Sequence, residues 1–200
     1  MTIRRFDFIS GPIDYRTMSH VKILLLRLLL PLIICIAPQS AWADVVVTFY
    51  SHELGSSFPH AFITVKGKID ATGEQIDDNH GFTAVNVSPA VLWGSVNGKM
   101  EKLKPKYIAS SDVRFSVTIN DAQYAELNAF ISKWAAEPQK NYNLNRRNCI
   151  HFVMEAAAAL GLNVNRKSKF FKKPRSFLEE VKSLNPSLQT PAEQTVAAGS

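Results

Sequence analysis

The order of its secondary-structure signals constrains the fold of this chain more than any other feature. Strand-like segments come first, at 45–52, 59–69 and 113–119, where β-branched and aromatic residues dominate or apolar and polar residues alternate. Helical spacing of apolar residues follows only after residue 120. Strands that precede helices typically form one sheet with helices on a face, so this order predicts an α+β fold with a mainly antiparallel sheet packed against helices.

The predicted helices begin at recognisable caps. Either Asn120 or Asp121 caps the first of them, and Asn148 caps an apolar stretch that contains four consecutive alanines and no helix breaker. The predicted helices cover 122–137, 149–160 and a shorter stretch that starts at Pro174.

Two segments between the strands are less regular. Residues 70–81, "DATGEQIDDNHG", are polar and contain Gly and Asp, which predicts a connection. Residues 82–98 predict a strand, a turn and then either a short strand or a short helix.

The N-terminus has the pattern of a secretory signal peptide. Residues 1–43 combine a basic start, an apolar run over 28–37 and a small-x-small end at residues 41–43. Met18 offers an alternative start, and an uncleaved anchor is the alternative to cleavage. The apolar run is shorter than the roughly 20 residues of a spanning helix. We therefore expect an exported protein, periplasmic or secreted, with no membrane span after signal removal.

Removal of the signal peptide changes the charge of the chain. The segment carries five basic and two acidic residues, so the net charge falls from +6 to +3. The basic pI therefore does not predict nucleic-acid binding, and we expect no nucleic-acid partner. Residues 44–184 are expected to form one domain, whereas 185–200 are rich in Pro, Gln, Thr and Ala and predict a disordered tail.

Signal removal also leaves a single cysteine. Cys35 lies in the signal peptide, so Cys149 is the remaining thiol, which either pairs with another chain or stays free. Its place at a helix start favours a nucleophile, because the first backbone N–H groups stabilise a thiolate and can hold an oxyanion. The alternative is that Cys149 fills the core as a small hydrophobe.

A thiol nucleophile needs a base within reach, usually histidine. After residue 43 the sequence contains four histidines: His52, His60, His80 and His151. The ring of His151, two residues after Cys149 on a helix, points to another face. His60 opens an alternating strand that can hold its ring, and either His80 or Asn86 could orient it.

Two motifs resemble a known superfamily. "FPHAFITVKG" upstream of "NCIHFVMEAAAALGL" resembles the circularly permuted branch of the papain-like, NlpC-type fold, which includes lecithin retinol acyltransferase-like enzymes and permuted papain-like peptidases. The resemblance covers about 60–162. It implies a permuted papain-like fold in which Cys149 is the nucleophile and His60 is the base.

The chain also departs from that pattern. The third catalytic member is not evident, with His80 the candidate, and residues 82–112 match no motif. In papain-like enzymes an amide side chain shortly before the cysteine can help form the oxyanion hole, and Asn143 or Asn145 could do so here.

These observations predict an exported thiol hydrolase or acyltransferase that acts on an amide or ester bond of a small-molecule, peptide or acyl substrate. The resemblance implies cell-wall peptide amides in a bacterial host. The alternative is a non-catalytic envelope binding module that uses the cleft or the basic residues 166–175. We expect no cofactor and no metal, since Cys149 and His151 lack further ligands at zinc spacing and no glycine-rich phosphate loop is present.

Overall fold

A computed structural model of the chain describes residues 45–53, 58–86 and 88–188. The predicted signal peptide and residues 189–200 of the predicted tail lie outside this part. Its elements are β1 (Val45–His52), β2 (His60–Lys68), β3 (Gln75–Ala84), α2 (Ala90–Trp93), β4 (Gly98–Glu101), α3 (Pro105–Ala109), β5 (Asp112–Ile119), α4 (Asp121–Ala136), α5 (Cys149–Ala159) and α6 (Pro174–Leu184).

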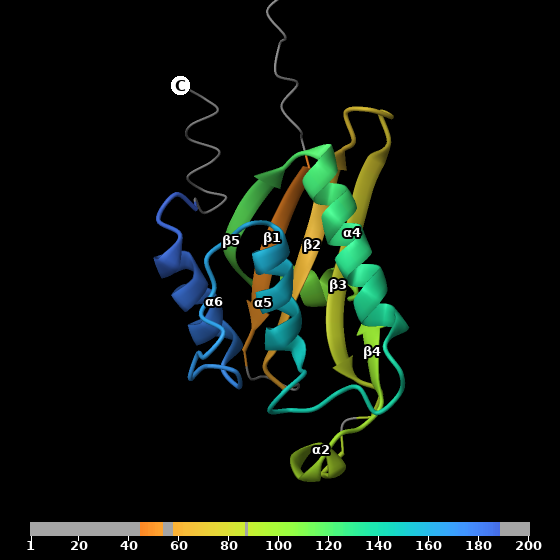
Figure 1. Cartoon of the computed structure of the whole chain (residues 1–200), viewed down its shortest axis with the longest axis vertical. Helices are drawn as coiled ribbons and strands as arrows, with labels where there is room; N and C mark the ends of the chain where they lie inside the picture. Colours follow the sequence, from red (N-terminus) through yellow and green to blue (C-terminus); the bar gives the residue numbers. More distant parts are fainter. Residues whose placement is uncertain (1–44, 54–57, 87, 189–200) are drawn as a thin grey trace, which may run out of the picture. The chain divides into compact units, whose positions relative to one another are not determined.

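The five strands form one sheet in the order β4-β3-β2-β1-β5, and every neighbouring pair is antiparallel (Figure 1). The strands expected at 45–52, 59–69 and 113–119 correspond to β1, β2 and β5. The prediction of an α+β fold with an antiparallel sheet is therefore confirmed.

Three helices, α4, α5 and α6, pack on one face of the sheet (Figure 1). Every second residue along the strands faces these helices, and Val47, Ile63 and Phe115 are examples with no exposed surface. On the other face α3 contributes Tyr107, whose ring packs against Phe62. The sheet is thus covered on the helical face by the main core and on the other by a smaller aromatic cluster.

The predicted connection at 70–81 is wrong in its second half, where β3 begins at Gln75. Its residues are polar and have low strand propensity, which hid the strand from sequence analysis. Pairing with neighbouring strands stabilises β3 in spite of its low strand propensity, because β3 lies between β2 and β4. In addition, the Asn79 side chain accepts a hydrogen bond from the Leu103 backbone N–H at 2.6 Å. The true connection is the short turn before Gln75, where Gly73 has a φ of 74°.

Ordered structure continues beyond the predicted start of the tail at residue 185. Asn185 is buried, and its side chain donates to the backbone carbonyls of Asn163 (2.9 Å) and Val181 (2.7 Å). Leu188 packs against the core. Asn185 and Leu188 therefore pack with the domain.

Candidate active site

Cys149 is the first residue of α5, and Asn148 is its N-cap, as predicted. The Asn148 Oδ1 accepts hydrogen bonds from the backbone N–H groups of Ile150 (2.9 Å) and His151 (3.2 Å). Its Nδ2 donates to the carbonyls of Leu144 and Phe171, both at 2.7 Å. One buried amide side chain therefore fixes the helix start against two loops and leaves the Cys149 N–H as the first-turn donor that Asn148 does not use.

The thiol of Cys149 is buried, and burial raises its pKa to about 11. Backbone N–H groups of Ala61, Ile150 and Cys149 itself oppose this shift, whereas the Glu101 carboxylate adds to it. The expectation that the helix start would favour the thiolate is corrected here. Desolvation outweighs the helix terminus, so the protonated thiol is favoured at neutral pH.

His60 opens β2 and is also buried. Burial, followed by the charge of His52, lowers the pKa of His60 to about 4, so its ring is neutral at pH 7. Its Nε2 has no hydrogen-bond partner within the described residues. No hydrogen bond joins His60 and Cys149 in that part of the chain, although both line the same cavity.

The nearest carboxylate to the His60 ring belongs to Glu101, which sequence analysis missed. Its Oε1 lies 3.5 Å from His60 Nε2, a contact that becomes an ion pair only when the ring is protonated. Burial raises the pKa of Glu101 as well, so desolvation favours the neutral forms of both groups over an ion pair. No motif surrounds Glu101 in the segment 82–112, so only strand pairing identifies it.

Strand register brings Glu101 to this position. Phe62 of β2 lies opposite Gly81 of β3, and Gly81 lies opposite Glu101 of β4. Gly81 leaves the space that the His60 ring occupies, because a Cβ at this position would lie 2.9 Å from His60 Nε2.

A cavity of about 960 Å³ joins these groups. Its wall also includes Tyr142, whose pKa is raised by burial and by the nearby thiol. Most of the remaining lining is apolar, which is typical of a ligand site with a few polar groups at fixed positions. The apolar lining residues are Phe58, Pro59, Ala84, Pro89, Val91, Leu92, Leu103, Leu144, Ile150, Phe171 and Pro174.

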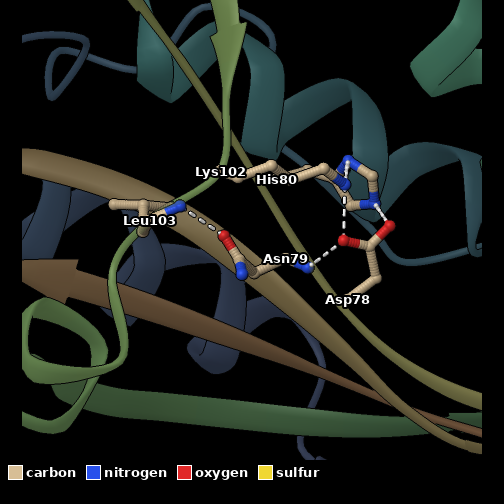
Figure 2. A network of polar contacts seen from close by, with 5 residues as sticks. All are labelled: Asp78, Asn79, His80, Lys102 and Leu103. Carbon is tan, nitrogen blue, oxygen red and sulfur yellow. Dashed lines mark hydrogen bonds and ion pairs between the residues drawn. The ribbon is translucent and has the colours of Figure 1, made fainter.

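The structure does not bring His80, the predicted third member, to this cavity. His80 lies on β3, not in a connection, and does not line the cavity. Its Nε2 lies 3.1 Å from Asp78 Oδ2, and its Nδ1 lies 3.3 Å from Lys102 Nζ, which also contacts Asp78 (Figure 2). His80 therefore belongs to a different polar group, which we call the Asp78 cluster and which consists of Asp78, His80 and Lys102. Of these three residues, Lys102 lines the cavity.

Asn143, the predicted oxyanion donor, also lies elsewhere. Its Nδ2 donates to Ser95 Oγ at 3.1 Å, and its Oδ1 accepts from the Asn145 backbone N–H at 3.0 Å. Neither asparagine lines the cavity. Both are used to close the loop before α5, so the first-turn N–H of Cys149 is the better-placed donor.

The remaining candidates do not line the cavity. His151 closes the capping box with Asn148 and stacks on Phe171 with a ring separation of 4.5 Å, as expected of a residue that faces away from the thiol. His52 Nδ1 lies 3.0 Å from Ser111 Oγ. Asn86 is exposed and does not line the cavity.

Within the described residues, no helix is both long and apolar enough to span a membrane. No protein-family model, curated protein sequence or solved structure matches the chain.

Proposed function

We propose that this chain is an exported thiol hydrolase or acyltransferase of the permuted papain-like fold. The observation that carries the proposal is the single cavity lined by Cys149, His60 and Glu101, which come from α5, β2 and β4. A nucleophile at a helix start, a base on a strand and a carboxylate beside that base are the parts of a thiol-based acyl-transfer site. Glu101 takes the third place for which the sequence suggested His80.

The first half of the reaction transfers an acyl group to sulfur. Cys149 Sγ attacks the carbonyl carbon of an amide or ester, while the neutral His60 ring accepts the Sγ proton. The Cys149 backbone N–H holds the oxyanion. The bond to the leaving group then breaks, and His60 returns its proton to the departing amine or alcohol, which leaves a thioester on Cys149.

The second half releases the acyl group. His60 accepts a proton from water, or from an acceptor alcohol or amine, whose oxygen or nitrogen attacks the thioester carbon. The C–S bond breaks, and the proton passes to sulfur, which restores the thiol. A peptide amide of a cell wall is the substrate class that the sequence resemblance favours.

The resting protonation states fit a general-base mechanism. A pKa of about 11 for Cys149 and of about 4 for His60 describe a neutral thiol and a neutral imidazole, not a preformed ion pair. Substrate that fills the cavity brings the ring and the thiol together, since hydrogen bonds in unliganded sites are commonly longer than in the working complex. Glu101 then stabilises the imidazolium that forms.

The test uses an activated aryl ester with the full chain in a Cys35→Ala background, so that Cys149 is its sole thiol. We expect a burst of aryl alcohol and a protein mass increase equal to one acyl group on Cys149. Cys149→Ala should abolish both signals, and His151→Gln is the matched control that should retain them. A chain that binds the ester but forms no acyl adduct would contradict the proposal and leave the binding module.

A further inference from the structure

Three large apolar side chains are exposed beside the cavity. Phe58 is 71% exposed, Leu92 70% and Trp93 89%. Phe58 and Leu92 line the cavity, and Trp93 follows directly as the last residue of α2. We call these three residues the apolar tip. A cluster of this kind in water marks an interaction surface, since single exposed apolar residues are common but grouped ones are not.

The apolar tip is not part of the domain core. The helix that carries two of its members, α2, has no buried residue and lies apart from the sheet and the other helices (Figure 1). Packing within the described domain therefore does not account for Leu92 and Trp93.

The mouth of the same cavity is basic. Lys104 and Lys172 line it and are exposed, and no ion pair involves either of them within the described residues. Lys102 also lines the cavity, but Asp78 engages it. Glu101 is the single acidic residue among those that line the cavity. The rim therefore carries positive charge that the described residues do not compensate.

We infer that this face docks on an anionic lipid bilayer, with the apolar tip in the interfacial region and Lys104 and Lys172 against lipid headgroups. Tryptophan prefers the membrane–water interface, where its ring meets the acyl region and its N–H stays near water. Lysines beside it are attracted by anionic headgroups. Nucleic acid fits less well, because it offers no apolar layer for Leu92 and Phe58.

Docking in this way places the cavity mouth at the bilayer surface. It does not require the chemistry proposed for Cys149, so the two proposals fail or succeed separately. Cys149→Ala should dock like the unmodified chain, so a failure of the proposed chemistry would leave docking intact.

The experiment follows the emission of Trp93 in the full chain with Trp42→Phe, which leaves Trp93 and the buried Trp134. The probes are phosphatidylcholine vesicles with brominated acyl chains, prepared with and without phosphatidylglycerol. We expect Trp93 emission to shift to shorter wavelength and to be quenched with phosphatidylglycerol vesicles. Since the signal comes from Trp93 itself, binding of the N-terminal apolar run does not produce it.

Two pairs of variants test the two components. Lys104→Gln with Lys172→Gln should weaken the Trp93 response roughly 25-fold in lipid concentration, at about fivefold per lysine. The control is Lys66→Gln with Lys68→Gln, which removes the same charge at the far end of β2 from His60. This variant should leave the Trp93 response unchanged. Leu92→Ser should weaken the response, whereas Leu184→Ser, an exposed apolar residue of α6, should not.

Trp93 emission that stays unquenched with phosphatidylglycerol vesicles would overturn the inference. Quenching could instead be equal with and without phosphatidylglycerol and unchanged by Lys104→Gln with Lys172→Gln. That result would overturn the proposed contact of these lysines with anionic headgroups. Without lipid, Trp93 could also become shielded as the protein concentration rises. That result would show that a second copy of the chain covers the apolar tip, and it too would overturn the inference.

Discussion

His60 and His80 are equally buried on neighbouring strands, each 9% exposed, yet their surroundings differ. Both ring nitrogens of His80 have polar neighbours, Asp78 at 3.1 Å and Lys102 at 3.3 Å (Figure 2). The Nε2 of His60 has no hydrogen bond, and its nearest carboxylate, on Glu101, lies 3.5 Å away. His80 thus has local compensation that His60 lacks.

The difference extends to the pKa values. Burial is the largest cause for both rings and lowers the pKa of each. At His80 the charge of Lys102 adds to this shift and the Asp78 carboxylate opposes it. At His60 the charge of His52 adds to the shift, no carboxylate is among the causes that oppose it, and the pKa falls to about 4. A buried polar group left without a partner costs stability, and the position of the His60 ring beside the cavity fits the role of base that we propose for it. This comparison favours His60 over His80 as the working histidine.

The largest effect should separate the two histidines by activity. His60→Gln removes the proposed base and should lower kcat/KM for an activated ester by about 10²–10⁴-fold, the usual contribution of general-base catalysis. His80→Gln should change it by no more than about twofold, since its ring lies outside the cavity. Steady-state kinetics with both variants measures the ratio. Equal losses would remove the distinction drawn between the two rings.

The next largest effect should distinguish His60 from His80 by the stability of the protein in acid. The ordinary pKa of histidine is 6.5 and that of folded His60 is about 4, so the unfolded state binds more protons between these values. The free energy of unfolding should therefore fall as pH drops from 6.5 to 4, by about 3 kcal/mol from this residue. Urea titrations across this window should show a flatter pH dependence for His60→Gln than for the unmodified chain. His80→Gln should flatten the pH dependence less, and the reverse order would contradict the strongly lowered pKa of His60.

A smaller effect should follow from displacing the His60 ring without changing a titratable group. Gly81→Ala places a Cβ 2.9 Å from His60 Nε2 and 3.3 Å from Leu103 Cδ1, so the ring must move. We expect a stability loss of about 1–3 kcal/mol together with reduced acylation. Gly94→Ala is the matched control, because a Cβ there meets nothing within 4 Å. Thermal unfolding and the acylation burst, measured on both variants, compare them.

The smallest effect is expected in the Asp78 cluster. Asp78→Asn removes the carboxylate that contacts His80 and Lys102, but the Asp78 side chain is 44% exposed and solvent screens these contacts. The stability loss should be about 0.5–1 kcal/mol, with no change in acylation. NMR titration of the His80 ring should show a further lowered pKa, since Asp78 raises it in the unmodified chain. A loss of activity in this variant would show that the Asp78 cluster affects the reaction through Lys102, which lines the cavity.

Sequence analysis by itself located Cys149 at a helix start and Asn148 as its cap. Both are local properties, because the capping hydrogen bonds join Asn148 to residues two and three positions later. It also located β1, β2 and β5, since apolar alternation along one strand is enough to indicate a half-buried surface. His60 followed from its place at the start of such a strand.

Only the tertiary structure decided the rest of the site. Glu101 reaches the His60 ring through the paired registers of β2, β3 and β4. His80 and Asn143 instead contact Asp78 and Ser95, which do not line the cavity. The local sequence around Cys149 was likewise not enough to predict the protonation state of its thiol. The helix start alone favours a thiolate, but desolvation by residues packed from other elements raises the pKa to about 11. Strand register and burial depend on contacts between residues far apart in the chain, which local patterns do not encode.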